Sequence, residues 1–249
     1  MAAEDAFDHH AQSERDFFAQ WGVNPAGDQL RWQREFDLLR RARPGGLGSV
    51  LSLGCGRGWF ETLLAEHADH VLGIDLSPES VRDARSLATQ KGCGNVEFLC
   101  ADVSTFELDR RFDTIICVAF LHHLTDSECL NLLVRIHRHL NTGGLLHTQD
   151  PNVHGLLRKV GRIVLGSRYD EFHTDDEREL DPTVVSQMFL EAGFESAEPH
   201  YMDFCLIPGM QLFPTAPAWT MRSLAAVDRA WCSLPVARWA SGFSINAIR

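Results

Sequence analysis

Apolar residues follow two different spacings along the chain, and the change between them falls near residue 44. Before that point, aromatic and aliphatic side chains recur at helical spacing among Arg, Gln and Glu, which predicts helices over 4–43 with a break near 22–27. The aromatic members of this stripe are Phe7, Phe17, Phe18, Trp21, Trp32 and Phe36. We interpret the stripe first as core packing, and second as a cover over the mouth of a ligand site.

From residue 49 onward, short apolar runs alternate with longer amphipathic segments. The runs predict strands at 49–53, 70–75, 96–100, 112–120 and 145–149. The segments between them predict helices over 59–67, 78–91 and 126–140, and Ser77 followed by Pro78 is typical of a helix start. This alternation predicts an α/β fold, with a doubly wound, mostly parallel sheet and helices on both faces.

The regular alternation is interrupted after residue 150. Further elements are predicted as a helix over 182–193, a sixth strand over 200–207 and a closing strand over 243–249. The stretch 153–168 combines apolar and basic residues, and fits a lid or an interface helix first and a surface on anionic lipid second. In the stretch 208–240, apolar residues at helical spacing fit the core or a homodimer contact first and an aromatic acceptor pocket second. They are Trp219, Leu224, Val227 and Trp231.

Composition narrows the class of protein. The 249 residues carry a net charge of −11, which argues against nucleic acid as a partner because phosphate contacts need clustered Lys and Arg. The chain has no run of 18 apolar residues and begins without the features of a signal peptide, so we predict a cytoplasmic protein without membrane insertion. Seven cysteines without a C-x-x-C pair predict free thiols, and the histidine spacing predicts no metal site.

Three glycines at alternate positions follow the first predicted strand. Gly54, Gly56 and Gly58 stand between that strand and the next helix, so the turn lacks Cβ atoms at these three positions and a ligand can approach its backbone there. Two carboxylates, Asp75 and Asp102, follow the next two strands. Because the carboxyl ends of parallel strands meet at one edge, we expect these groups to lie around one ligand.

The chemistry of these positions favours an adenosine-type ligand. Asp75 can accept hydrogen bonds from both hydroxyls of a ribose, and Asp102 can accept one from an exocyclic amine while the N–H of Val103 donates to the adenine ring. The spacing is G-x-G-x-G and no G-K-[ST] follows, so a dinucleotide and a nucleoside triphosphate are both disfavoured.

With these motifs in order, the chain resembles the class I S-adenosylmethionine-dependent methyltransferases, particularly the bacterial small-molecule methyltransferases. The matching segments are 50–58, 73–77, 101–103, 112–118, 121–124 and 143–146. The resemblance implies a Rossmann-like sheet of seven strands with the last one antiparallel. It also implies one domain over 1–249. Its parts are a helical cap at 1–44, a cofactor-binding core at 45–150 and a completing segment at 151–249, in which insertions at 153–180 and 208–240 form a lid on the substrate side.

The resemblance further implies S-adenosylmethionine as the cofactor. The residues expected to contact it are Gly54, Cys55, Gly56, Asp75, Leu76, Asp102, Val103 and Val118. One position departs from the family pattern. The family carries Asp or Glu two residues before the first glycine, where it helps to hold the amino group of the cofactor, and this chain carries Ser52.

The function that follows is methyl transfer to a small, hydrophobic or aromatic acceptor through O, N or C, as in small-molecule biosynthesis. His123, with His122 second, follows the fourth strand and has a suitable pKa to take the proton of the acceptor. The other interpretation packs one ring beside the cofactor and turns the other outward. Asp150 and His173 are further candidates near the rim. Two alternative functions stay open: a relative that binds S-adenosylmethionine without methylating, and an interaction protein that retains only the fold.

Overall fold

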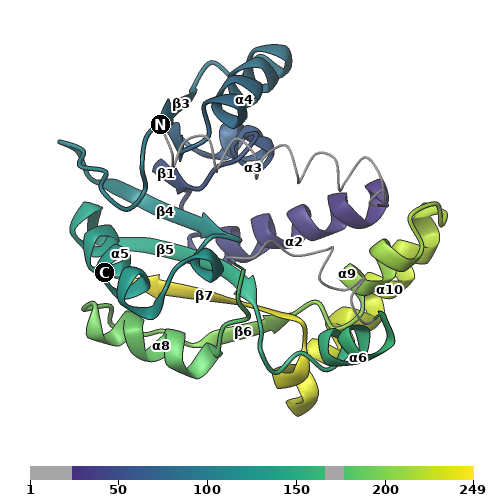
Figure 1. Cartoon of the computed structure of the whole chain (residues 1–249). Helices are drawn as coiled ribbons and strands as arrows, with labels where there is room; N and C mark the ends of the chain where they lie inside the picture. Colours follow the sequence, from purple (N-terminus) through teal and green to yellow (C-terminus); the bar gives the residue numbers. More distant parts are fainter. Residues whose placement is uncertain (1–23, 166–176) are drawn as a thin grey trace.

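The computed structural model describes residues 24–165 and 177–249 (Figure 1). The first part of the predicted N-terminal helical segment, with its aromatic residues up to Trp21, lies outside the described residues, and so does His173.

Seven strands form one sheet in the order β3-β2-β1-β4-β5-β7-β6. Their bounds are β1 Ser49–Leu53, β2 His70–Asp75, β3 Val96–Cys100, β4 Phe112–Val118, β5 Leu140–Pro151, β6 Pro199–Met202 and β7 Gly242–Ile248. Strands β1 to β5 pair in parallel, whereas β7 runs antiparallel to both of its neighbours, β5 and β6. The predicted fold is confirmed. The order reverses between β1 and β4, and the carboxyl edge beside such a reversal is where open α/β sheets bind ligands.

Helices cover both faces of the sheet (Figure 1). Their bounds are α2 Pro25–Ala42, α3 Trp59–Leu64, α4 Pro78–Lys91, α5 Asp126–His139, α6 Leu156–Leu165, α8 Pro182–Glu191, α9 Leu206–Leu212 and α10 Ala218–Cys232, with short 3-10 turns η1 Ala65–His67, η2 Leu121–His123 and η3 Pro235–Trp239. Helices α2, α3 and α4 bury apolar residues against one face, around Val50, and α5 and α8 do so against the other, around Leu51. Alternate residues of β1 therefore serve two cores, as expected of a central strand.

Local sequence accounts for where several helices begin. The Asn24 side chain accepts hydrogen bonds from the N–H groups of Ala26 and Gly27, and Pro25 occupies the first turn of α2. Ser77 caps α4 through the N–H of Ser80, as its sequence predicts. These caps satisfy N–H groups that have no partner within the helix.

The sixth strand is shorter than its apolar pattern predicts and ends at Met202. Asp203 takes a left-handed backbone conformation, with φ of 63°, which ends the strand. Beyond it, the N–H groups of Cys205 and Leu206 donate to Asp228 at 2.6 and 3.2 Å, and α9 begins. The expectation of a strand over 203–207 is therefore wrong.

The residues that α10 buries are not those of the apolar stripe described in the sequence analysis. Trp219, Val227 and Trp231 are 67%, 47% and 46% exposed, so these residues do not belong to the core, whereas the homodimer contact and the acceptor pocket stay predictions. Met221 is buried instead, because α10 crosses α2 at Gly27, where an added Cβ would lie 3.2 Å from the Met221 sulfur. The close crossing of the two helices determines which face is buried.

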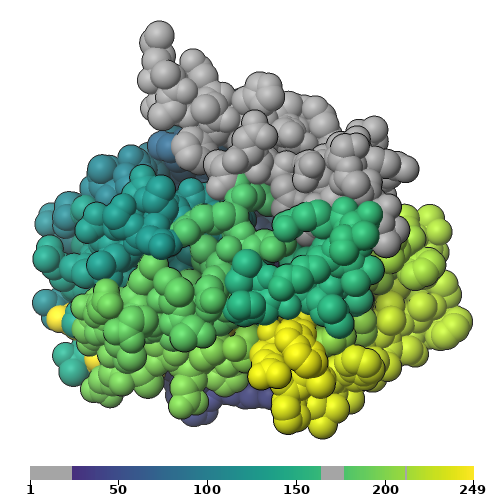
Figure 2. All heavy atoms as spheres, turned by 60° about the horizontal axis from the view of Figure 1, so that its bottom comes forward, coloured from purple at the N-terminus to yellow at the C-terminus, as the bar shows by residue number. Residues whose placement is uncertain are grey.

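The described parts of the two late insertions lie beyond the carboxyl ends of the sheet (Figure 1). Figure 1 shows α6, α9 and α10 past the arrowheads of β4 and β5. Figure 2 shows α6 at the surface, bordered by the yellow C-terminal part of the chain. Its apolar residues Leu156, Val160 and Ile163 are 46%, 44% and 83% exposed. Within 24–165 and 177–249, no helix has both the length and the hydropathy to cross a bilayer.

Candidate cofactor and acceptor site

The glycine turn joins β1 to α3, and its three glycines all have positive φ. A Cβ on Gly54 would lie 2.4 Å from the Phe120 ring, and one on Gly58 would lie 2.6 Å from the Phe98 ring. A Cβ on Gly56 would meet nothing within 4 Å. Gly54 and Gly58 are therefore required by packing inside the protein, whereas Gly56 presents bare backbone to open space.

Asp75 ties the end of β2 to this turn. One carboxylate oxygen accepts the N–H of Gly56 at 2.8 Å and the other accepts the N–H of Ser77 at 2.9 Å. The carboxylate is half-buried, and Leu76 beside it is half-buried as well. The two features that the sequence predicts to share a ligand are in direct contact.

The ends of β3 and β4 supply the other predicted cofactor contacts. The N–H of Ala101 donates to the Asp75 carbonyl at 3.0 Å, which brings the turn after β3 next to Asp75. In that turn Asp102 is exposed and accepts the N–H of Ser104, while the Val103 side chain is buried. Val118 ends β4 and is half-buried. The predicted residues therefore border the carboxyl edge of neighbouring strands.

A buried carboxylate lies beneath the turn, contributed by a residue that sequence reasoning missed. Ser52 donates its hydroxyl to Glu61 of α3 at 2.5 Å, and Glu61 is 2% exposed. The second Glu61 oxygen is buried without a hydrogen-bond partner. Burial, together with the charge of Asp75, raises the pKa of the Glu61 carboxyl to about 7, although the hydrogen bond from Ser52 opposes this shift. The signal in the sequence was an acidic residue on the inner face of an otherwise apolar helix.

This raised pKa leads to a stability prediction. The folded chain holds the Glu61 proton at pH values where the unfolded chain has released it, so stability falls as pH rises from about 5 to 7 and is level above. The free energy of unfolding of the wild type should fall by about 1.4 kcal/mol per pH unit in that window. The Glu61→Gln variant should lack this pH dependence. Urea unfolding at several pH values measures it. The control is Glu66→Gln, an exposed change in the helical segment that follows α3, and its stability should depend on pH as that of the wild type does. If the stability of Glu61→Gln also had the same pH dependence as the wild type, the raised pKa would not belong to Glu61.

The histidine pair lies at the end of β4, in the turn η2. His122 and Asp150, at the end of β5, are both buried, and Nδ1 of His122 lies 3.0 Å from the Asp150 carboxylate. The backbone N–H of His122 donates to the same oxygen at 3.2 Å. Burial raises the pKa of the Asp150 carboxyl, and the His122 ring opposes this. Since Nδ1–H faces a carboxylate, the lone pair of the neutral ring is assigned to Nε2.

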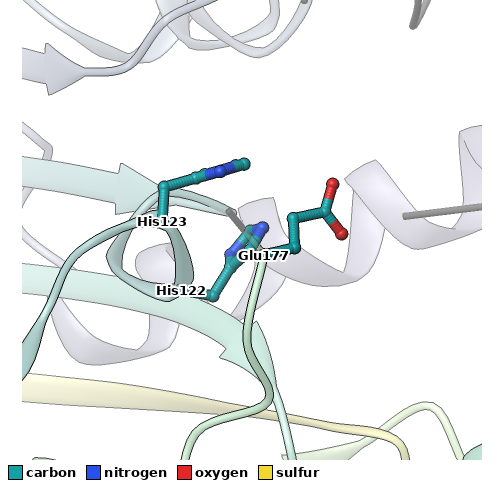
Figure 3. A group of neighbouring side chains, drawn as sticks. All are labelled: His122, His123 and Glu177. Atoms are coloured by element: carbon teal, nitrogen blue, oxygen red, sulfur yellow. The ribbon is translucent and has the colours of Figure 1, made fainter. Parts of the chain in front are cut away.

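His123 and Glu177 complete a group of three. The rings of His122 and His123 have their centroids 4.1 Å apart. One donor atom from each of His122, His123 and Glu177 lies within 4.8 Å of the other two, and Figure 3 shows the three side chains converging. These residue types can hold a metal ion, whereas the sequence analysis expected no metal. Glu177 was missed because it stands more than fifty positions after the histidines.

The comparisons with known proteins agree with this geometry. Residues 50–144 match the family described as a methyltransferase domain. A segment of 80 residues is 35% identical to ubiquinone biosynthesis O-methyltransferase of Coxiella burnetii, covering 32% of this chain and 34% of that protein. A segment of 131 residues is 35% identical to trans-aconitate 2-methyltransferase of Azoarcus sp., covering 50% and 49%. The chain thus spans between about a third and a half of the length of these curated relatives.

A solved structure extends the likeness to the whole fold. Magnesium protoporphyrin IX methyltransferase of Synechocystis PCC 6803, solved with S-adenosylhomocysteine bound, superposes with a TM-score of 0.67 over 100% of this chain and 98% of that one. The sequence identity is 17%, so this likeness concerns the fold. Strand order and glycine turn agree with the match of residues 50–144 to the methyltransferase-domain family, and the fold is that of class I S-adenosylmethionine-dependent methyltransferases. The resemblance inferred from the sequence motifs is confirmed.

Proposed function

We propose that the chain binds S-adenosylmethionine across the carboxyl edge of β1, β2 and β3 and transfers its methyl group to a small-molecule acceptor held in front of β4 and β5. The observation that carries the proposal is the open backbone at Gly56, next to the Asp75 carboxylate. The match of residues 50–144 to the methyltransferase-domain family supports S-adenosylmethionine as the cofactor. The named reactions of the curated relatives support methyl transfer to a small molecule.

The cofactor contacts follow from the positions around the turn. Each oxygen of the Asp75 carboxylate can accept more than one hydrogen bond, so the carboxylate would accept the ribose hydroxyls while it holds the N–H groups of Gly56 and Ser77. Asp102 is exposed and would accept the adenine amino group. The remaining predicted contacts lie along the same edge. They are Gly54, Cys55, Leu76, Val103 and Val118.

We assign to Glu61 the negative charge that the family pattern places at position 52. The Glu61 carboxylate is hydrogen-bonded to Ser52 and lies beneath the glycine turn, so its charge would favour the cofactor ammonium group across a low-dielectric region. Loss of that charge in Glu61→Gln should weaken S-adenosylhomocysteine about tenfold at pH 8, where the wild-type carboxyl is ionised. If Glu61→Gln and the wild type bound S-adenosylhomocysteine equally well, Glu61 would not supply this charge. The other parts of the proposed function do not depend on this result.

Calorimetry with S-adenosylhomocysteine tests the cofactor site of the proposed function. The wild-type chain should bind one equivalent saturably. A chain that is folded, as judged by circular dichroism, and gives no binding heat at several temperatures would overturn the proposal.

On the acceptor side, the histidine pair is proposed to act on the acceptor. Methyl transfer is an in-line displacement, so most of the work is alignment and exclusion of water. An O–H or N–H acceptor must also lose a proton. Asp150 orients the His122 ring, and Nε2 of that ring would accept the proton. His123 stacks beside it.

His122→Ala should lower kcat by about 10²-fold to 10⁴-fold while the affinity for S-adenosylhomocysteine stays unchanged. The control is His70→Ala, because His70 also faces a carboxylate, 3.5 Å away on Glu97, but lies at the opposite edge of the sheet. Steady-state kinetics and calorimetry measure the two quantities. Full turnover by His122→Ala would exclude a role for this ring in the reaction.

A further inference from the structure

We propose that His122, His123 and Glu177 bind a divalent transition-metal ion, and that this ion takes an ionisable oxygen of the acceptor as its next ligand. The inference rests on the proposed function and deepens it, because it makes the acceptor an oxygen compound. Two imidazoles and one glutamate are a donor set that zinc uses in sites with an open coordination position.

The spacing of the donor atoms fits an ion after a modest movement of side chains. The three atoms lie within 4.8 Å of one another without metal. Metal–ligand bonds of about 2.1 Å place tetrahedral ligands roughly 3.4 Å apart. His123 and Glu177 are half-buried, and a change of side-chain rotamer at these two residues would close the gap.

Asp150 supplies a second and independent observation. It is 1% exposed and accepts hydrogen bonds from both the ring and the backbone of His122. A histidine that binds a metal almost always donates its other ring N–H to such a carboxylate or carbonyl, which fixes the ring and makes the ligating nitrogen more basic. His122 therefore already has the hydrogen bond typical of a metal ligand, which leaves Nε2 as the ring nitrogen available to the ion.

The backbone next to Glu177 is held against η2. The N–H of Arg178 donates to the His122 carbonyl at 3.1 Å, and the Arg178 guanidinium donates to the Leu124 carbonyl at 2.6 Å. These two bonds of Arg178 hold the backbone of the adjacent Glu177 opposite the histidines. The placement does not depend on the hydrogen bonds of the Glu177 carboxylate. The bonds of Arg178 thus position the third ligand, which Figure 3 shows beside the two histidines.

A bound ion at this place would change how the acceptor loses its proton. A hydroxyl oxygen that coordinates a divalent ion has a much lower pKa, so its proton passes to solvent near neutral pH. The oxygen lone pair then forms the new C–O bond as the methyl C–S bond breaks, and the thioether leaves uncharged. In the metal-free alternative, Nε2 of His122 takes the proton directly.

The test is a Zn²⁺ titration of the chelator-treated full chain, with a chromophoric competitor, supported by the visible spectrum after Co²⁺ substitution. We expect one Zn²⁺ per wild-type chain. His123→Asn and Glu177→Gln should each bind at least tenfold more weakly and lose the Co²⁺ bands. His200→Ala, which removes an exposed histidine on β6, should match the wild type.

Two results would overturn the inference: no stoichiometric Zn²⁺ in the wild type, or equal Zn²⁺ affinity in the His123 and Glu177 variants. Thermal unfolding of each variant shows that it is folded. S-adenosylhomocysteine affinity, measured on the same samples, should not change. If the cofactor analogue fails to bind while Zn²⁺ binds, the proposed function fails and the metal site stands. If the analogue binds and Zn²⁺ does not, the histidines act without metal.

Discussion

Replacing Asp75 by alanine is expected to weaken the binding of S-adenosylhomocysteine by at least about a hundredfold. The carboxylate lies at the end of β2 and accepts the N–H of Gly56, so it both orders the glycine turn and presents oxygens to the ribose. Hydrogen bonds to a charged group contribute about 1.5–3 kcal/mol each. Loss of two therefore predicts a decrease in affinity of at least about a hundredfold.

Calorimetry measures the effect, with Asp109→Ala as the control because Asp109 is exposed and lies in the loop before β4. Asp75→Asn keeps the size of the side chain and one acceptor oxygen, so its affinity should fall between those of the wild type and Asp75→Ala. An affinity of Asp75→Ala within threefold of the wild type would place the cofactor elsewhere on the chain.

The largest stability effect is expected from Arg34→Ala on α2. The Arg34 guanidinium donates to both oxygens of Asp203 at 2.7 and 2.9 Å and lies 3.5 Å from Asp228. Burial raises the pKa of the Asp203 carboxyl, and Arg34 opposes this. Without Arg34, the buried carboxylates of Asp203 and Asp228 lose the cation that they share, and the free energy of unfolding should fall by about 3–5 kcal/mol.

Urea unfolding at neutral pH measures this loss, and Arg41→Ala, an exposed change on the same helix, should cost well under 1 kcal/mol. Adding Asp203→Asn to Arg34→Ala should recover part of the loss, because it removes one of the two like charges. A loss below 1 kcal/mol for Arg34→Ala would mean that the ion pairs do not anchor α2.

Much of the fold could be predicted because the relevant signals are local. The strands at 70–75 and 96–100 have the predicted bounds, since apolar runs between turn residues specify buried parallel strands. Ser77 and Pro78 specify the start of α4 by hydrogen bonding within one turn. The family motifs then predicted the topology of the sheet, which local sequence patterns alone do not specify.

What could not be predicted depends on contacts between distant segments. Asp203 ends β6 in a backbone conformation that its position in an apolar run does not reveal. Glu177 reaches the histidines only because Arg178 bonds to η2. The Glu61 carboxylate reaches Ser52 because the first turn of α3 packs on β1. The sequence alone does not show that a carboxylate nine residues later lies next to the position where the family carries one.

The most direct test of the account follows a labelled methyl group from S-adenosylmethionine into an acceptor. The wild-type chain is incubated with the labelled cofactor and a panel of phenols, hydroxyquinolines and polycarboxylic acids, and the products are separated by mass spectrometry. The account predicts that one acceptor gains the label and that S-adenosylhomocysteine forms in equal amount. Consumption of the cofactor with the label in no acceptor, or no consumption with any acceptor by a chain that binds S-adenosylhomocysteine, would contradict it.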